Sequence, residues 1–273
     1  MAEAITKNVQ QVWWQAANAP WMLQRRPFRV APHVYYVGNN WVGAYLLDGG
    51  SELALIDTMI FEDAYQLINS IWELGFAPQK IRKILLTHCH IDHSGGVNPI
   101  KSLSGAKVWQ SKEDTAFLKH PANAGAGDMF KVVDYEVDEF FSDDKPVTVG
   151  NLTVHTKLTP GHTPGTTSFF IEDQDENGKR LVVALHGGVG TNTMGNDFLD
   201  QFHLGRSLRS RFIEDCKAMK SNHVDISLPS HPAHGDLFQR LGADSNDYTT
   251  FINPQEWAHF LDIRREFAEQ LEK

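Results

Sequence analysis

The feature that most constrains this chain is the run His88-Cys-His-Ile-Asp-His93, which directly follows a stretch with the character of a buried strand, residues 81–87. It places four histidine and aspartate side chains, which are candidate metal ligands, within six positions. Imidazole nitrogen and carboxylate oxygen are good ligands for an ion such as zinc. Alternate side chains of an extended loop project to one side, so we expect the first, third and fifth residues to converge and His93 to turn away. The fold must therefore end a buried strand at a metal site.

Two distant histidines are the candidates to complete such a site, because one loop cannot fill two coordination spheres. His162 lies in the turn of residues 159–165, Thr-Pro-Gly-His-Thr-Pro-Gly, where proline restricts the backbone and glycine permits unusual angles. His231 lies in Pro-Ser-His-Pro, residues 229–232, after another expected strand. An isolated histidine is more often a hydrogen-bonded core or surface residue. Both follow strand ends, as His88 does, and this placement predicts that they are ligands.

Strands and helices follow one another in an order that predicts two sheets. Short β-branched runs between turn residues open the chain as an antiparallel meander, and later strands lead into helices. The expected strands are residues 34–37, 42–47, 53–56, 81–87, 152–158, 166–171, 181–185 and 224–228, and the expected helices are 62–75, 95–105, 205–220 and from 254 onward. Strands then a helix, twice over, predict an α/β fold of two sheets face to face with helices outside.

The length and composition limit the domain organisation and the partners. A chain of 273 residues can bury a large core, and we expect a single domain, 1–273, of two similar βα halves with residues 1–27 as an N-terminal extension packing on it. The net charge of −9 and the lack of a basic stripe argue against nucleic acid. No apolar run approaches the roughly 20 residues of a membrane-spanning helix. A small-molecule substrate is therefore the expected partner.

The cysteines and the first residues bear on the compartment. Cys89 and Cys216 are the two cysteines, and we expect both to be free thiols, which suits a reducing compartment. The chain opens without the basic and then apolar stretch of a secretory signal. The sequence as it stands predicts a cytoplasmic protein, and earlier removal of a leader would instead indicate a periplasmic or secreted one.

The cluster at residues 88–93, the turn at 159–165 and the segment Leu55-Ile-Asp-Thr58 together resemble the metallo-β-lactamase superfamily, over residues 28–235. The resemblance implies a four-layer αββα sandwich that holds two zinc ions. It implies one zinc on His88, His90 and His162, and the other on Asp92, His93 and His231. Asp57 matches a family aspartate that accepts a hydrogen bond from the ring nitrogen of a ligating histidine that does not bind the metal. By itself, Asp57 also reads as a simple turn residue.

The position that distinguishes branches of this superfamily comes after residues 181–185. Glyoxalase II-like thioesterases and many lactonases carry a bridging aspartate there, and the first subclass of metallo-β-lactamases carries a cysteine. This chain has Gly188, which offers no side chain, so the second metal would rely on solvent besides its three protein ligands. That set is similar to the metallo-β-lactamases of subclass B3, and residues 27–38 and 230–232 also resemble that subclass.

The resemblance implies a hydrolase in which zinc lowers the pKa of a bound water toward roughly 7. Asp92 would accept a hydrogen bond from the attacking hydroxide and so act as a catalytic residue. Opening of a β-lactam ring is the leading expectation. The alternative is a lactonase or thioesterase of the same fold, with little or no β-lactamase activity. A third class, the flavodiiron oxygen reductases, is disfavoured because its iron ligands are rich in carboxylates.

The substrate pocket departs from subclass B3 in its polar residues. Those lactamases carry serine-type residues after this strand that hold the carboxylate of the antibiotic, whereas this chain offers Thr191 and Asn192. His186 is an extra histidine beside the candidate site. It reads equally as a further ligand, as a donor to the substrate, or as a strand-end residue that faces away.

Overall fold

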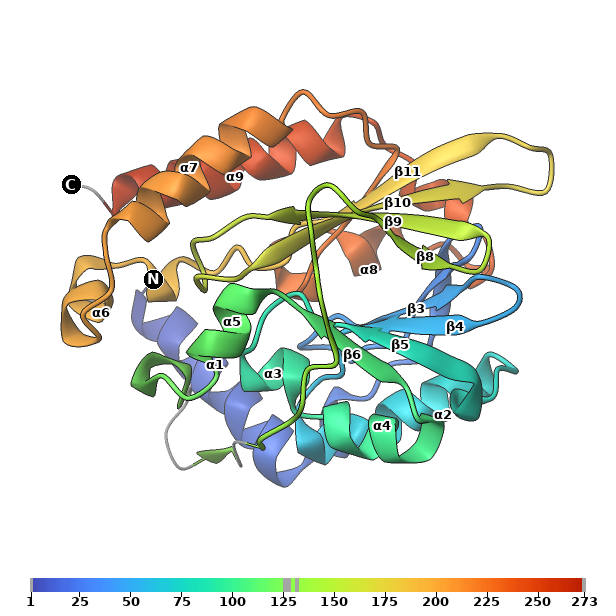
Figure 1. The fold of residues 1–273 in the computed structure, drawn as a ribbon, viewed down its shortest axis with the longest axis horizontal. Coiled ribbons are helices and arrows are strands. Elements are labelled where there is room, and N and C mark those ends of the chain that lie inside the picture. The colour runs from blue at the N-terminus through green and yellow to red at the C-terminus, as the bar shows by residue number, and fades with distance from the viewer. Residues whose placement is uncertain (1, 125–128, 131–132, 272–273) are drawn as a thin grey trace.

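Two β-sheets lie face to face between two outer layers of helices in the computed structural model (Figure 1). The structure describes residues 2–124, 129–130 and 133–271. Apolar clusters fill the space between the sheets and the space between each sheet and its helices. The predicted four-layer αββα sandwich is therefore confirmed.

The first sheet has seven strands and carries the N-terminal half of the chain. Its first four strands pair antiparallel, which confirms the predicted meander, and the later ones pair parallel. In spatial order the strands are β1 (Phe28–Ala31), β2 (Val34–Tyr36), β3 (Tyr45–Asp48), β4 (Leu53–Ile56), β5 (Ile81–Leu85), β6 (Lys107–Gln110) and β7 (Glu139–Phe140). The helices α2 (Ala64–Glu73) and α4 (Val97–Ser104) cover its outer face (Figure 1).

The second sheet has five strands, antiparallel except for one parallel pair at its edge. In spatial order they are β12 (Ile226–Leu228), β11 (Arg180–Leu185), β10 (Thr167–Gln174), β9 (Leu152–Leu158) and β8 (Val147–Val149). The helices α7 (Ser207–Met219) and α9 (Glu256–Gln270) cover its outer face (Figure 1).

The parallel strand pairs bring the candidate loops to one edge of the sandwich. Ile56 pairs with Leu85 in the first sheet, and Leu185 pairs with Leu228 in the second. All four residues end their strands within the core between the sheets. The carboxyl ends of parallel strands meet at one edge, where ligands of open α/β sheets commonly bind. The four segments that follow these strands therefore leave the core together.

The predicted strand 42–47 is too long at its start, because residues 38–44 form a tight turn. The side-chain oxygen of Asn39 accepts hydrogen bonds from the backbone N–H groups of Trp41 and Val42, both at 2.9 Å. Such local bonds compete with strand pairing. A Cβ on Gly38 would lie 2.3 Å from the oxygen of Val42, so only glycine permits this turn. The strand begins at Tyr45 instead.

Several elements are not among those that the sequence predicts. They include β1, β6, β7, β8, a short helix α3 (Ile91–Ser94), α5 (Lys112–Phe117), α6 (Asn196–Gln201), α8 (Leu237–Arg240) and the N-terminal helix α1 (Ala2–Asn18), which leads into the 3-10 helix η1 (Pro20–Leu23). Ala16 and Leu23 pack with Ile60, and Gln66 of α2 donates a hydrogen bond to the carbonyl of Pro20 at 2.6 Å. No helix in the described part of the chain is both long and apolar enough to cross a bilayer.

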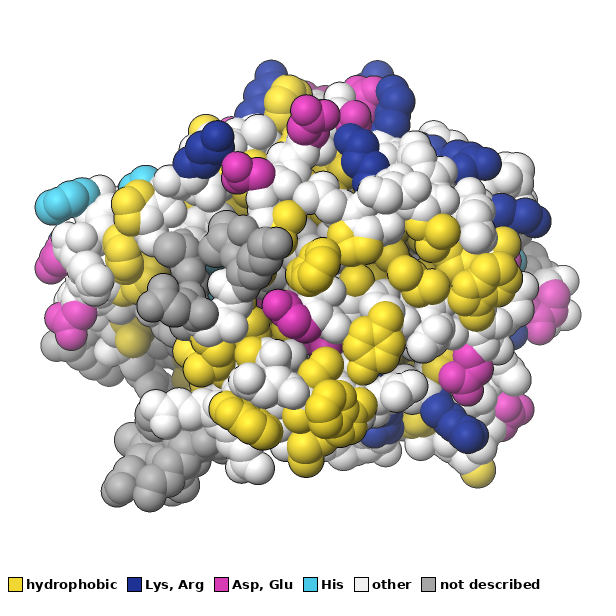
Figure 2. Space-filling model, turned by 90° about the horizontal axis from the view of Figure 1, so that it is seen from below, with side chains coloured by type: hydrophobic (Ala, Val, Ile, Leu, Met, Phe, Trp, Pro, Cys, Tyr) yellow, Lys and Arg dark blue, Asp and Glu magenta, His cyan; other side chains and the backbone are white. Residues whose placement is uncertain are grey.

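Large apolar side chains remain exposed where the N-terminal segment meets α2. Trp21, Phe61, Tyr65 and Trp72 are 64%, 43%, 43% and 51% exposed. Figure 2 shows apolar side chains gathered on the face that is seen from below.

Asp63, just before α2, leads to a prediction about pH. Its carboxylate is buried and accepts hydrogen bonds from Asn39 at 2.7 Å and Gln66 at 3.3 Å. Burial raises its pKa to about 7, against the lowering effect of Asn39. The folded state then holds this proton more tightly than the unfolded state, so its contribution to stability is full at acid pH and is lost as the pH rises through about 7.

We therefore expect the free energy of unfolding of Asp63→Asn, taken relative to that of the natural protein, to increase between pH 5 and about pH 7. The slope that one such group adds is at most about 1.4 kcal/mol per pH unit. Urea unfolding of both proteins in excess chelator measures this slope without a contribution from metal. Parallel stability curves for the two proteins would contradict the assignment.

Candidate metal centre

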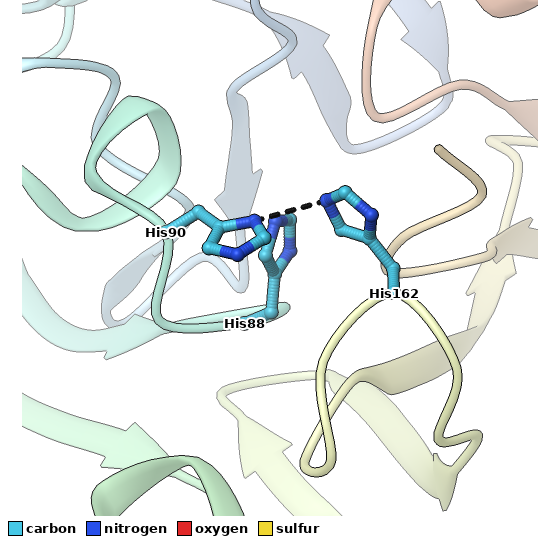
Figure 3. A group of neighbouring side chains, drawn as sticks. All are labelled: His88, His90 and His162. Carbon is cyan, nitrogen blue, oxygen red and sulfur yellow. Dashed lines mark hydrogen bonds between the residues drawn. The ribbon is translucent and has the colours of Figure 1, made fainter. Parts of the chain in front are cut away.

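The loops after β5, β9 and β12 carry the histidines that the sequence singles out, and the structure brings them together. His88 and His90 follow β5, His162 lies in the turn between β9 and β10, and His231 follows β12. Figure 3 shows the rings of His88, His90 and His162 directed toward one another from two separate loops. The centre therefore joins residues that are far apart in sequence: His90 and His162 are separated by 72 positions, and His93 and His231 by 138.

His88, His90 and His162 form the first ligand group, in which one ligand atom from each lies within 4.8 Å of the others. Nδ1 of His90 is 3.0 Å from Nε2 of His162. Nδ1 of His88 contacts the hydroxyl of Thr87 at 3.0 Å, while its Nε2 is buried without a hydrogen-bond partner among the described residues. A buried nitrogen left unpaired beside two further imidazoles is what a cation site offers. These residues are positioned to hold a metal ion.

Asp92, His93 and His231 form a second ligand group beside the first. Oδ2 of Asp92 lies 3.6 Å from Nε2 of His93 and 3.3 Å from Nε2 of His231. The two Nε2 atoms are 3.2 Å apart. His88 adjoins this group too, since its ring centroid is 4.1 Å from that of His93 and it also groups with Asp92 and His93. The two groups are therefore neighbours.

The expectation of an extended loop through residues 88–92 is wrong beyond His90. That residue is extended and begins the one-turn helix α3, in which the N–H groups of His93 and Ser94 donate to its carbonyl at 2.9 and 3.0 Å. A Cβ on Gly95 would lie 2.7 Å from the carbonyl oxygen of Ile91. Any other residue at this position would therefore clash with the backbone of the turn. The helical turn puts Asp92 and His93 in the same group, instead of on opposite sides.

Each of three candidate ligands has its other ring nitrogen occupied. Nδ1 of His93 bonds the carboxylate of Asp57 at 2.8 Å, and that of His162 bonds the carbonyl of Gly190 at 2.8 Å. Nδ1 of His231 bonds the carbonyl of Trp41 at 2.8 Å. A partner on one nitrogen fixes the tautomer, so that Nε2 is free to bind a metal.

Asp57 is more than a turn residue in this structure. It is buried at 1% exposure and also accepts hydrogen bonds from the backbone N–H and the hydroxyl of Thr87, at 2.8 and 2.7 Å. Its φ of 57° lies in the left-handed region. Such a conformation costs free energy and persists where surrounding contacts enforce it. The carboxylate of Asp57 therefore ties His93 to the end of β5.

Burial keeps the first ligand group neutral. It lowers the pKa of His88 and His162 well below the usual range and that of His90 to about 4. Burial opposes ionisation of Asp92, but His93 and His231 hold the pKa of its carboxyl well below the usual range. Neutral imidazoles and an ionised carboxylate are the forms that bind metals.

Gly188 packs against a candidate ligand. A Cβ at this position would lie 2.9 Å from Cδ2 and 3.0 Å from Cβ of His162. The backbone therefore occupies the space beside the ring, and a side chain here would push on His162.

His186 lies on the other side of this segment. It is fully buried, its ring packs on Phe212 with centroids 5.4 Å apart, and its Nδ1 accepts from the N–H of Gly188 at 3.3 Å. Burial lowers its pKa to about 3. Among the described residues it belongs to neither ligand group. Its packing on Phe212 agrees with the reading of His186 as a strand-end residue outside the two ligand groups.

Thr191 and Asn192 lie at the edge of the centre, in the 3-10 helix η6 (Thr191–Thr193). Thr191 is half-buried and Asn192 is exposed. Sequence reasoning missed Thr193, whose hydroxyl is 3.1 Å from Nδ1 of His162 and donates to the carbonyl of the same residue at 2.7 Å. Nothing in the spacing of this loop marks that contact, because it depends on how the loop folds back.

Comparison with known proteins identifies the family. Residues 42–175 match the model of the metallo-beta-lactamase superfamily. The chain is 26% identical over 168 residues to the probable metallo-hydrolase YqgX of Bacillus subtilis, covering 59% of this chain and 75% of that protein. It is 29% identical over 131 residues to hydroxyacylglutathione hydrolase GloC of Haemophilus influenzae, covering 47% and 60%. It is 34% identical over 122 residues to glyoxylase B2 of Dictyostelium discoideum, covering 41% and 38%, so it spans less than two thirds of the last two relatives.

Solved structures share the fold over nearly the whole chain. BJP-1, a subclass B3 metallo-β-lactamase of Bradyrhizobium japonicum, superposes with a TM-score of 0.82 at 24% identity, covering 94% of this chain and 97% of that one. The metallo-β-lactamase GOB-18 from Elizabethkingia meningoseptica gives a TM-score of 0.80 at 26% identity, covering 92% and 94%. The common architecture is therefore the metallo-β-lactamase fold.

Proposed function

Because this chain carries a metallo-β-lactamase superfamily domain, we propose that it is a hydrolase that uses two zinc ions to open the β-lactam ring. The proposal rests on two adjoining ligand groups, one of three imidazoles and one of two imidazoles and a carboxylate. Gly188 stands where other branches of the superfamily carry a bridging aspartate or a cysteine. This donor set is similar to that of subclass B3, the subclass of BJP-1.

The residues present fit two zinc ions. We assign one ion to His88, His90 and His162, and the other to Asp92, His93 and His231. Nitrogen and carboxylate oxygen are donors that zinc prefers, and three protein ligands leave an open position for water or substrate. The unpaired Nε2 of His88 supports the assignment, since leaving such an atom unbonded costs about 1–3 kcal/mol.

The chain's own residues would act by holding and orienting groups. When bound, the zinc ions would supply an activated water at neutral pH and polarise the carbonyl of the substrate. Asp92, as an ionised carboxylate, would accept a hydrogen bond from the attacking water and aim it. Asp57 would keep His93 in the productive tautomer. Thr191 and Asn192, at the rim, would bind the carboxylate of the substrate.

A second candidate is a thioesterase or lactonase. The likeness to hydroxyacylglutathione hydrolase GloC and to glyoxylase B2 favours it. Gly188 argues against it, because it offers no bridging carboxylate.

Metal content and a substrate panel test the proposal. We expect about two zinc ions per chain, turnover of nitrocefin and a carbapenem, and loss of turnover after dialysis against a chelator, with recovery on addition of zinc. An acyl-homoserine lactone and a glutathione thioester, assayed in parallel, test the second candidate. Two bound zinc ions without any β-lactam turnover would contradict the leading proposal, and thioester cleavage by the same sample would establish the alternative.

A further inference from the structure

We propose that Asp114 is a positioning residue that clamps the two metal-binding loops together and so sets the metal affinity of the first ligand group. The inference rests on the proposed function only in that this group must bind a metal. It does not depend on which carbonyl compound is hydrolysed.

One carboxylate contacts both loops. Oδ2 of Asp114 accepts the backbone N–H of Cys89 at 2.8 Å and the hydroxyl of Thr163 at 2.9 Å. Its Oδ1 accepts the backbone N–H of Gly165 at 2.7 Å. Cys89 lies between two ligands of the first group, and Thr163 follows the third in sequence. No contact joins Asp114 to a candidate ligand itself among the described residues, so it would act through the loops.

Helix α5 holds Asp114 in this place. The hydroxyl of Ser111 caps the helix by accepting the N–H of Asp114 at 3.2 Å, and it donates to the carbonyl of Gly165 at 2.7 Å. A Cβ on Gly165 would lie 2.1 Å from that hydroxyl oxygen and 2.3 Å from the nitrogen of Asp114. The last glycine of the turn 159–165 is therefore needed so that the turn can lie directly against the helix.

No ion pair among the described residues accounts for the burial of the Asp114 carboxylate. Asp114 is 0% exposed, and no lysine or arginine of the described chain forms an ion pair with it. Burial raises its pKa to about 6, even though the hydrogen bonds from Thr163, Cys89 and Gly165 act to lower it. A buried carboxylate is costly unless its hydrogen bonds are satisfied, and here all of the donors come from the two loops and not from a cation.

Metal affinity depends on the separation of these loops. The 3.0 Å between Nδ1 of His90 and Nε2 of His162 spans the gap between them. Productive metal geometry tolerates displacements of about 0.5 Å. Partners behind the ligands commonly contribute 10- to 100-fold to metal affinity. A loosened clamp would therefore weaken metal binding while the sandwich stays folded.

The test is the variant Asp114→Asn. The amide has the same shape as the carboxylate, but its NH2 group would face a hydrogen-bond donor of one of the two loops where a carboxylate oxygen now accepts. We expect zinc affinity at the first group to fall by about 10- to 100-fold, measured by competition with a chromophoric chelator. The imidazole NMR signals of the histidines resolve the two groups, and those of His93 and His231 should saturate at zinc concentrations closer to those of the natural protein. Circular dichroism and thermal unfolding show whether the variant is folded.

Asp173→Asn is the matched control. Asp173 is also a buried carboxylate that joins distant segments, since it accepts the N–H of His33 at 2.8 Å. It lies near the far end of β10, about 20 Å along the strand from the turn that carries His162. We expect it to lower the melting temperature and to leave zinc affinity unchanged.

Thr163→Val keeps the proposal testable if Asp114→Asn does not fold, because it removes a single donor to the carboxylate. We expect a several-fold loss of zinc affinity at the first group. Natural affinity in folded Asp114→Asn, or in Thr163→Val where Asp114→Asn fails to fold, would overturn the clamp. If the natural protein itself binds no zinc, the proposed function fails as well, so the two failures are distinguishable.

Discussion

Replacement of Asp92 by asparagine is expected to lower kcat/KM for the hydrolysed substrate by about 10²- to 10⁴-fold. Asp92 provides the one carboxylate among the six proposed ligands, and its Oδ2 lies within 3.6 Å of both His93 and His231. Asparagine has nearly the same shape but carries no charge. It would bind a cation poorly and could not hold the attacking water as a carboxylate does.

Zinc content and kinetics together give the measurement. We expect Asp92→Asn to keep about one zinc ion, on the three-imidazole group, and to lose the other. Asp138→Asn is a suitable control, because that carboxylate bonds Lys101 and the N–H of Val108 and belongs to neither ligand group. A variant at Asp92 that retains both ions and natural turnover would remove this residue from the mechanism.

Replacement of Gly188 by aspartate is expected to weaken zinc binding by about 10- to 100-fold, and not to create a bridging ligand. Family patterns alone suggest the opposite, since a carboxylate at this position bridges two metals in other branches. Here the new Cβ would lie 2.9 Å from Cδ2 of His162. The ring would have to shift, and this would disturb the present 3.0 Å distance between its Nε2 and Nδ1 of His90. Crowding of a ligand therefore outweighs the gain of a charge.

Gly195→Asp tests the same substitution without the crowding. Gly195 lies in the same loop, and a Cβ there has no atom within 4 Å. We expect this control to retain its zinc, as judged by chelator competition. Tighter zinc binding in Gly188→Asp than in the natural protein would contradict this prediction. It would show that the ring of His162 can move enough for an aspartate at position 188 to bind the metal.

Local motifs made much of the fold and centre predictable. The four layers follow from the order of apolar runs and turns, and the candidate ligands are marked by strand ends that precede them. Part of their convergence follows from a topological rule, since strands of one sheet that run in the same direction end at one edge. Gly95 and the turn 159–165 have sequence signatures because the close backbone approaches there exclude other residues.

The remainder depends on contacts that have no local signature. The partners of His162 and His231 are carbonyl oxygens of Gly190 and Trp41, and every residue has such an oxygen. The bend at α3 requires knowledge of how Gly95 packs on a neighbouring segment. Asp114 lies between the two ligand loops in sequence and reads there as an ordinary acidic residue in the first turn of a helix.

The origin of the ligands in both sheets has a consequence for how the chain unfolds. His88 and His93 follow β5 of the first sheet, whereas His162 and His231 leave strands of the second. An ion in either group therefore ties one sheet to the other, much as a covalent staple would. The unfolded chain has no preformed site, so free metal shifts the folding equilibrium by mass action, by about 2.7 kcal/mol at a hundred times the dissociation constant. Metal bound in either group would therefore raise the free energy needed to separate the two sheets.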